Sequence, residues 1–250
     1  MHSDYDPRLS IRGEGRAVVL VPGMNGTGEL FYRQVPLIER SYRVATYSFR
    51  DNAESLEVLA ADLARTVDAV APVERRAVIV GESFGGAVAL TFALRYPERV
   101  AALVILNSFP YFAPQVRLRL AIAGITVLPG GAMSLVRHLT AFRLHSRHTH
   151  RADVKQFIAL TAHATRDGYI NRLKLLRRFD VRERLHDILQ PALFLASEHD
   201  HLVPAVVQAR YMADRVPSGT MRILKGHGHI CLIAPDLDLA QILHEWQGDS

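Results

Sequence analysis

The stretch IVGESFGGAVAL, residues 79–90, gives the clearest indication of the fold class. An apolar run breaks into small residues around a single serine, Ser83, and then continues with helical spacing. Glycines two residues before and after the serine fit a tight turn between a strand and a helix, because they leave room around the displayed hydroxyl. The pattern predicts that Ser83 stands at the end of a buried strand. The alternative is an ordinary glycine-rich turn with a helix-capping serine.

Strand and helix patterns alternate on both sides of this turn. Helical spacing of apolar residues predicts helices after the turn, over residues 55–70 and near the carboxyl end of the chain. Near-continuous apolar runs predict six strands, at residues 16–23, 42–49, 76–83, 101–108, 191–198 and 221–226. This alternation predicts an α/β fold with a doubly wound, mostly parallel sheet of about six strands.

The alternation stops between residues 109 and 186. Helical patterns dominate there, at 154–164 and 169–179, and no strand pattern is evident. The same segment holds fourteen Lys and Arg against four Asp and Glu, an excess of 14 − 4 = +10 in a chain of net charge +5. We therefore expect a basic helical cap at 109–186, inserted into a core made of residues 1–108 and 187–250.

A serine hydroxyl needs a base before it can attack. The stretch LASEHDHLVP, residues 195–204, carries Asp200 just beyond a predicted strand, and LKGHGHICLIAPD, residues 224–236, carries His229 beyond the last one. The order serine, acid, histidine is the one that accompanies this kind of turn. We interpret Ser83 as the nucleophile, His229 as its base and Asp200 as the acid that orients the imidazole.

Two of these assignments have neighbours that compete with them. Glu198 lies in the same loop as Asp200; we favour Asp200 as the acid because HLVP follows it. His227 lies two residues before His229; we favour His229 as the base because a short Gly-His turn before a helix fits that role. Both alternatives remain open at the level of sequence.

Acyl chemistry also needs donors for a negatively charged oxygen. The backbone amide of Phe84, next to the serine, is one candidate; the amide of Met24 in LVPGMNGTGELF, residues 20–31, is the other, because the glycines there let the backbone approach a ligand. A flexible turn without such a role is the alternative. This loop has neither the lysine of a phosphate loop nor the spacing of a dinucleotide site, so we expect no cofactor.

Together these motifs resemble the α/β-hydrolase superfamily. The likeness rests on PGMNGTG, GESFGG, EHDHLVP and GHGHICLIAPD, and it covers residues 16–108 and 188–247. It implies the roles given above for Ser83, Asp200 and His229, and a cap inserted after the strand that ends near Ser108. A weaker likeness to esterase and acyltransferase members points to long acyl chains. Pro22 departs from the commoner pattern, in which a histidine precedes the loop glycine, and the extra amino-terminal hairpin is not evident.

The cap segment suggests what the site accepts. Phe109, Tyr111 and Phe112 are expected near its mouth, where they suit a hydrophobic acyl substrate, although fastening the cap to the sheet explains them equally well. The histidines of residues 138–151 have one carboxylate nearby and many arginines, so we expect no metal site. The basic face could meet an anionic carrier or surface, or serve solubility alone.

Other partners and compartments are limited by composition. The single cysteine, Cys231, excludes an internal disulfide and agrees with a reducing compartment. No apolar stretch is long enough to span a bilayer, no secretory signal is recognised and no nucleic-acid motif accompanies the positive charge. We expect a cytoplasmic enzyme acting on a small molecule.

Three functions follow from this interpretation. The first is a serine hydrolase that cleaves a carboxylic ester or thioester through an acyl-enzyme. The second is an acyltransferase, in which an alcohol replaces water as acceptor. The third is a ligand-binding protein that keeps the fold without turnover.

Overall fold

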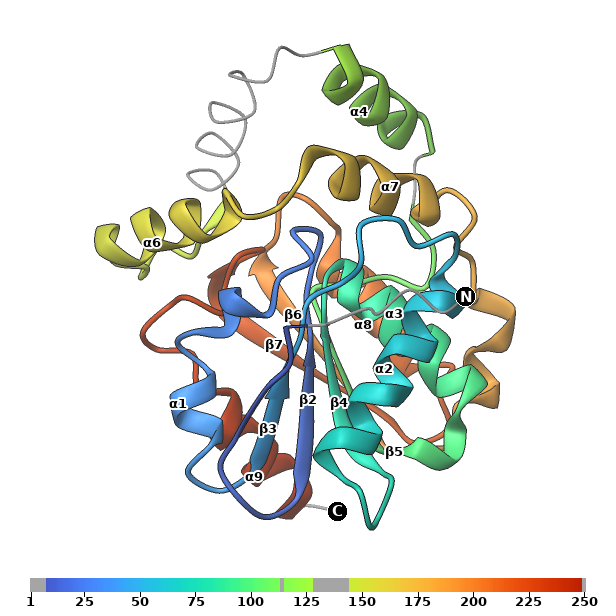
Figure 1. Ribbon diagram of the computed structural model, residues 1–250, viewed down its shortest axis with the longest axis vertical. Coiled ribbons are helices and arrows are strands. Elements are labelled where there is room, and N and C mark those ends of the chain that lie inside the picture. Colours follow the sequence, from blue (N-terminus) through green and yellow to red (C-terminus); the bar gives the residue numbers. More distant parts are fainter. Residues whose placement is uncertain (1–7, 113–114, 128–143, 249–250) are drawn as a thin grey trace.

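A seven-stranded sheet forms the centre of the computed structural model, which describes residues 8–112, 115–127 and 144–248 (Figure 1). The strand order is β1-β3-β2-β4-β5-β6-β7; β1 pairs antiparallel with β3, and all other pairs are parallel. The strands are β1 Ser10–Arg12, β2 Ala17–Val21, β3 Arg43–Thr46, β4 Ala77–Glu82, β5 Val100–Leu106, β6 Ala192–His199 and β7 Gly219–Gly228. The predicted α/β fold with a mostly parallel sheet is confirmed.

The strand β1 is the element that the sequence pattern missed. It has three residues, Ser-Ile-Arg, with exposed first and last side chains, and it lies at the edge of the sheet beside β3. A strand so short and polar carries no apolar run, so the pattern of buried strands could not indicate it. The other six strands coincide with the six that the sequence predicts.

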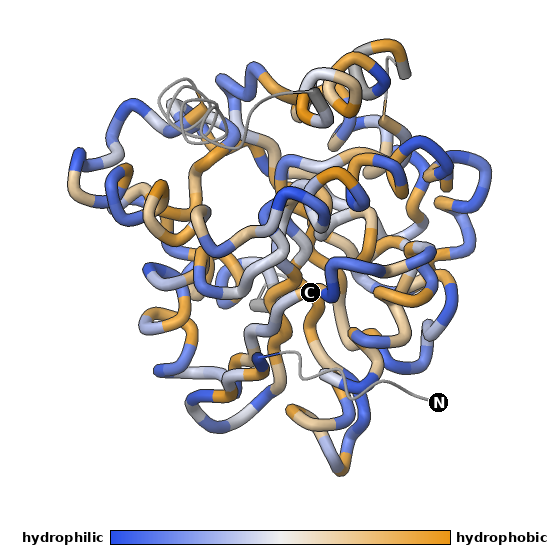
Figure 2. The backbone as a smooth tube through the Cα atoms, turned by 45° about the horizontal axis from the view of Figure 1, so that its top comes forward, coloured by the Kyte–Doolittle hydropathy of each residue, from blue (hydrophilic) through white to orange (hydrophobic). Residues whose placement is uncertain are grey.

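Helices cover both faces of the sheet. Alternate residues of each central strand point to opposite sides: Val18 and Leu20 of β2 pack toward α1 and α9, whereas Val19 and Val21 pack toward α2, α3 and α8. These helices are α1 Val35–Ile38, α2 Leu56–Val70, α3 Phe84–Arg95, α8 Ala205–Ala213 and α9 Leu239–Gly248, with short 3-10 turns η1 Gly28–Phe31, η2 Pro97–Arg99 and η3 Arg182–Asp187. The tube view shows hydrophilic residues mostly on the outer loops (Figure 2).

Among the described residues between β5 and β6 there are three further α-helices. They are α4 Gln115–Val127, α6 Arg151–Thr161 and α7 Arg166–Leu176, and they lie beyond the ends of the strands rather than on a face of the sheet (Figure 1). A bridge between Tyr111 and Asp180 joins the beginning and the end of this segment. The helices therefore stand over the edge at which the parallel strands end, where ligands of open α/β sheets bind.

Polar contacts fasten these helices to the core. On α6, the buried Asp153 receives hydrogen bonds from Tyr32 and from the Arg33 guanidinium, at 3.2 and 2.9 Å. On α7, Arg172 is paired with Asp51 at 3.1 Å. These bonds connect the segment to the loops that follow β2 and β3.

Candidate active site

Ser83 occupies a strained turn between β4 and α3. Its backbone angles, φ 53° and ψ −117°, lie in the region that disfavours side chains. A Cβ added at Gly81 would lie 2.6 Å from the Gly85 carbonyl oxygen, and one at Gly85 would collide with the Val21 carbonyl. The motif's glycines are thus needed because strand and helix backbones approach closely here. The turn is held by a 2.9 Å bond from Ser83 N–H to the Leu106 carbonyl.

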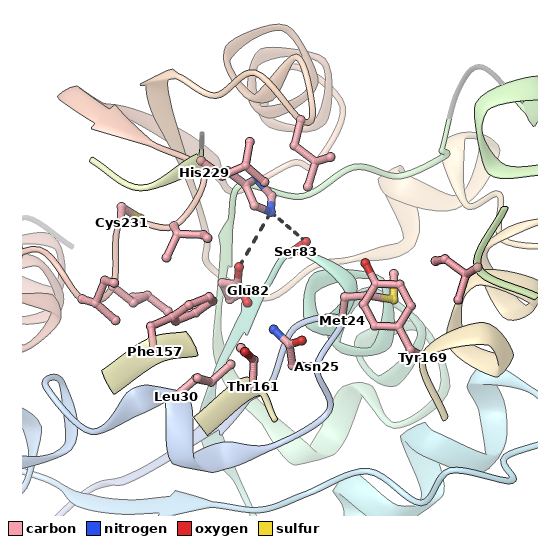
Figure 3. A pocket seen from close by; sticks show the side chains of 16 residues that line it. Met24, Asn25, Leu30, Glu82, Ser83, Phe157, Thr161, Tyr169, His229 and Cys231 are labelled. Carbon is pink, nitrogen blue, oxygen red and sulfur yellow. Dashed lines mark hydrogen bonds and ion pairs between the residues drawn. The ribbon is translucent and has the colours of Figure 1, made fainter. Parts of the chain in front are cut away.

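Ser83, His229 and Asp200 form one hydrogen-bonded series. His229 Nε2 lies 3.1 Å from Ser83 Oγ (Figure 3). Its Nδ1 lies 2.7 Å from Asp200 Oδ2. All three side chains are buried or nearly so, and Asp200 is 1% exposed. A carboxylate on Nδ1 favours the tautomer with its proton there, which leaves the Nε2 lone pair facing the serine hydroxyl. This arrangement suits a general base.

The loop that follows β6 fixes the Asp200 carboxylate. Its second oxygen, Oδ1, accepts 2.9 Å hydrogen bonds from the backbone N–H groups of Leu202 and Val203. With one oxygen held by the backbone and the other facing His229, the carboxylate has a single orientation. This loop is the HLVP context that favoured Asp200 in the sequence.

The competing residues lie elsewhere. The Glu198 carboxylate accepts a 2.9 Å hydrogen bond from the Gly226 N–H, and it does not contact His229. His227 faces Ser146, with 3.0 Å between Nδ1 and Oγ, and its Nε2 lies 3.8 Å from Asp236. Geometry therefore favours Asp200 and His229, as the sequence interpretation did.

Electrostatics raise the pKa of His229. Burial opposes the charged imidazolium, but the Asp200 carboxylate, through its hydrogen bond and its charge, and the nearby Glu82 outweigh it. The imidazole therefore holds a proton more readily than a free histidine, a property that suits a general base.

The loop after β2 faces the serine. Met24 and Asn25 line the same pocket as Ser83, and Phe84 is the buried first residue of α3. The Arg172 guanidinium holds this loop from outside: Nε donates to the Met24 carbonyl at 2.8 Å and Nη2 to the Asn25 carbonyl at 3.3 Å. Because both carbonyls are bound to the arginine, the backbone orientation of the loop is set by a side chain from α7.

A mostly apolar pocket opens above Ser83 (Figure 3). Among the described residues that line it, the polar side chains besides Ser83 and His229 are Asn25, Glu82, Thr161 and Tyr169, and there is no lysine or arginine. The remaining lining residues are Met24, Leu30, Ile125, Leu144, Phe157, Leu202, Ile230, Cys231, Leu232 and Ile233. Such a pocket suits a substrate with a hydrophobic portion and few polar groups.

Three residues expected at the mouth of the site do not line this pocket. Phe109 is buried, and its ring packs edge-on against Phe112 and Phe179. Tyr111 lies under the Arg182 guanidinium, 4.2 Å from the ring centre. The structure thus favours the other explanation of these aromatics, namely that they fasten the inserted segment to the sheet. The residues that replace them in the pocket come from α6, α7 and the loop after His229.

The described residues contain no group of three or more metal-ligating side chains. His145 pairs through its backbone with Ile230, and Asp153, the carboxylate nearest in sequence to the histidines, is bound to Tyr32 and Arg33. The described part of the chain also has no helix that meets the length and hydropathy needed to cross a membrane. Some basic residues of the inserted segment, such as Arg172, have acidic partners in the protein.

Sequence reasoning missed Arg172, described above, and two further residues that shape the site. Asn107, at the end of β5, donates to the His229 carbonyl at 2.9 Å and accepts from the Ser197 N–H at 2.7 Å, so it joins the histidine loop to β6. Glu82 lies inside the quoted motif, but its residue type gave no indication that it faces the pocket. A polar residue at the carboxyl end of an apolar strand was the available signal in both cases.

Comparison with known proteins agrees with the fold. Residues 16–234 match the family model described as "alpha/beta hydrolase fold". The chain is 26% identical to "Putative carbamate hydrolase RutD" of Caulobacter sp. (strain K31), over 94% of this chain and 92% of that protein. It is 28% identical to the protein of the same name from Caulobacter vibrioides, over 86% and 84%.

Solved structures share the fold at lower identity. A bromoperoxidase from Bacillus anthracis superposes with a TM-score of 0.83 at 17% identity, over 96% of this chain and 95% of that one. A thermophilic esterase from Thermogutta terrifontis superposes with a TM-score of 0.81 at 22% identity, over 96% and 92%. At such identities the likeness concerns the fold alone.

Proposed function

We propose that this chain, which belongs to the alpha/beta hydrolase fold family and is a hydrolase, cleaves a carboxylic ester or thioester. The cleavage passes through a covalent acyl-enzyme. The observation that carries the proposal is the hydrogen-bonded series from Asp200 through His229 to Ser83 Oγ, which opens onto a mostly apolar pocket. These are the groups that acyl transfer requires: a nucleophile, a base that takes its proton, and an acid that orients the base and stabilises its charged form.

The first half of the reaction acylates the serine. Ser83 Oγ attacks the carbonyl carbon of the substrate while its proton passes to His229 Nε2, and the carbonyl oxygen becomes negatively charged. When the intermediate collapses, the bond to the leaving oxygen or sulfur breaks and His229 returns the proton to that atom. The Asp200 carboxylate stabilises the imidazolium that exists between these two transfers.

Water completes the cycle. His229 takes a proton from a water molecule as the water oxygen attacks the acyl carbon. When the second intermediate collapses, the bond from the acyl carbon to Ser83 Oγ breaks, His229 returns the proton to Ser83 Oγ and the carboxylic acid is released. The amides of Met24 and Phe84 are the proposed donors to the negatively charged oxygen in both halves. Removal of one such donor costs about 3 to 4 kcal/mol of transition-state stabilisation in serine hydrolases.

The segment 109–186 acts as a cap in this proposal. Side chains from α4, α6 and α7, namely Ile125, Phe157 and Tyr169, line the pocket together with residues of the core. An apolar cover excludes bulk water from the acyl group and contributes binding energy through buried area. The same apolar cover suits the hydrophobic acyl substrate that the sequence predicts.

Carbamate cleavage is a second candidate. It is favoured by the relatives named "Putative carbamate hydrolase RutD", which span nearly the whole chain at 26–28% identity. A carbamate presents the same carbonyl to the same serine, so both candidates share one mechanism. Parallel assays with a carbamate and with the ester of matching shape separate them.

Hydrolysis of butyryl to decanoyl esters by the wild type and by Ser83→Ala tests the proposal. We expect hydrolysis by the wild type and a loss of three orders of magnitude or more in the variant. Equal rates in the two proteins would refute the serine mechanism. Adding a primary alcohol to the same assay identifies the acceptor: an acyltransferase forms a new ester, whereas a hydrolase yields the free acid.

A further inference from the structure

Glu82 presents a carboxyl group to the reacting atoms. It is the last residue of β4, directly before Ser83, and its side chain is 18% exposed. Its Oε1 lies 3.9 Å from His229 Nε2, and Figure 3 shows the side chain pointing toward the imidazole beside the serine hydroxyl. The carboxyl therefore shares the space in which bond breaking takes place.

The loop after β2 is shaped to admit this carboxyl. A Cβ added at Gly23 would collide with Glu82 Oε2, so the carboxyl fills the space that a side chain at position 23 would take. Gly23 has no positive φ, which means that close approach rather than backbone conformation requires glycine there. The space beside Gly23 therefore holds the Glu82 carboxyl in the lining of the pocket.

The Glu82 carboxyl has unused hydrogen-bonding capacity. Within the described residues, its one polar contact is the 3.9 Å approach to His229, and no protein N–H or O–H donates to it. A carboxylate that is largely removed from water and accepts no hydrogen bond destabilises the folded protein, because nothing replaces its hydration. A donor on a bound ligand would offset that cost.

The pocket also favours positive charge. Glu82 and Asp200 are both acidic, His229 is neutral when it acts as base, and the described lining includes no lysine or arginine. The site is thus locally negative in a chain of net charge +5. This local negative charge indicates a cationic ligand group.

The carboxyl lies within reach of a leaving group bound next to His229. In the acylation step His229 Nε2 returns its proton to the leaving atom, so that atom must lie within hydrogen-bond distance of Nε2. Since Glu82 Oε1 is 3.9 Å from the same nitrogen, a substituent two or three bonds beyond the leaving atom reaches the carboxyl.

We propose that Glu82 selects substrates whose leaving alcohol or thiol carries a protonated amine two or three atoms from the scissile bond. This inference rests on the proposed function and narrows it to amino-alcohol or amino-thiol esters. The carboxylate accepts a charge-assisted hydrogen bond from the ammonium N–H, which aligns the leaving atom under His229 Nε2. Glu82 is thus a specificity determinant and not an additional base.

The preference should depend on pH. Burial raises the pKa of Glu82 to about 7, with Asp200 raising it and His229 lowering it. Burial raises the pKa of Tyr169 and raises that of Cys231 to about 12, so both stay neutral in this range. His229, whose pKa is raised from 6.5, titrates in the same range, but loss of the neutral base slows hydrolysis of every ester alike. The carboxyl is therefore protonated at pH 6 and mostly ionised at pH 7.5, and the preference for the ammonium should grow between these values.

A pair of isosteric esters tests the inference: 2-(dimethylamino)ethyl butyrate, whose amine is protonated at neutral pH, and 3-methylbutyl butyrate, in which CH replaces NH⁺. For the wild type at pH 7.5 we expect kcat/KM to be roughly ten- to a hundredfold higher for the ammonium ester, the range for a hydrogen bond to a charged group. The ratio of the two values should fall to near one in Glu82→Gln, and also in Gly23→Ala, where the new methyl group displaces the carboxyl.

Glu74→Gln is the matched control. Glu74 is exposed and precedes the opposite end of β4, so this variant removes the same charge far from the pocket and should keep the wild-type ratio. Effects on the histidine or on the oxyanion donors change both esters alike and cancel in the ratio. An unchanged ratio in Glu82→Gln, with hydrolysis that still depends on Ser83, overturns this inference and leaves the proposed function standing.

If neither ester is turned over, protection replaces turnover as the readout. Labelling of Ser83 by an active-site fluorophosphonate probe is then measured with 2-dimethylaminoethanol or 3-methylbutanol present. Stronger protection by the amine in the wild type, lost in Glu82→Gln, supports the inference, and equal protection overturns it. No labelling at all refutes the proposed function and this inference with it.

Discussion

At the residue scale, the imidazole of His229 lies between a carboxylate that favours its charged form and a buried setting that disfavours it. The net effect raises its pKa above the ordinary value of 6.5. A general base must be neutral before it acts, so activity should rise with pH through this raised pKa. The serine, buried and 3.1 Å from Nε2, has no titration of its own in this range.

Replacing the acid tests this account of the histidine. In Asp200→Asn we expect kcat to fall by roughly three to four orders of magnitude, because the amide no longer holds the proton on Nδ1 or stabilises the imidazolium. The residual activity should rise with pH through a lower pKa than that of the wild type, as the raising interactions are lost. The pH dependence of kcat/KM for one ester measures both effects. An unchanged pKa in Asp200→Asn would contradict the assigned role.

Ionisation of Glu82 lowers the free energy of unfolding of the protein. An acid whose pKa rises from 4.5 in the unfolded chain to about 7 in the folded protein holds its proton more tightly when folded, so stability declines as pH rises between these values. The full effect is about 3 kcal/mol above pH 7. Glu82→Gln stays neutral, so its free energy of unfolding should exceed that of the wild type by more at pH 8 than at pH 5. Urea unfolding at the two pH values measures it, and a difference that does not vary with pH would contradict the burial of an ionisable carboxyl.

At the scale of elements, α7 reaches across the pocket to the loop after β2. Arg172 is 2% exposed, and its guanidinium binds two carbonyls of that loop and the Asp51 carboxylate. A helix of the inserted segment therefore sets the backbone that carries the Met24 amide. Its position makes Arg172 a positioning residue rather than one that touches substrate.

We expect Arg172→Met to lower kcat by ten- to a hundredfold with little change in KM, because the loop loses its orientation while the apolar pocket remains. Its matched control is Lys174→Met, a change of the same kind at an exposed position of the same helix. Steady-state kinetics and thermal unfolding of both variants distinguish a local effect from a loss of folding. A fall in kcat that merely tracks lost stability would contradict the positioning role.

The elements also show what a single sequence can predict. Apolar runs and helical spacing identified the six buried strands and their covering helices, because both patterns arise from burial itself. The strand β1, with its polar Ser-Ile-Arg sequence, carries no such signal. Phe109 and Phe112 were expected at the pocket and instead pack against the core, since apolar composition does not say which apolar surface a side chain meets.

At the scale of the whole molecule, the chain brings the ends of β2, β4, β5, β6 and β7 to one edge and covers them with α4, α6 and α7. Motif order brought Ser83, Asp200 and His229 together in the prediction, because their places relative to the strands follow from the topology. The roles of Asn107, Arg172 and Glu82 depend on side chains that meet only after folding, over separations of up to 148 residues. No local pattern records such contacts.

The central claim is that Ser83 carries the acyl group during turnover. The most direct measurement is intact-protein mass spectrometry of enzyme quenched in acid during hydrolysis of p-nitrophenyl butyrate, followed by peptide mapping. We expect the wild-type peptide that contains Ser83 to carry the added mass of one butyryl group, and the Ser83→Ala protein to carry no adduct. Hydrolysis that continues in Ser83→Ala, with no adduct on the wild type, would contradict it.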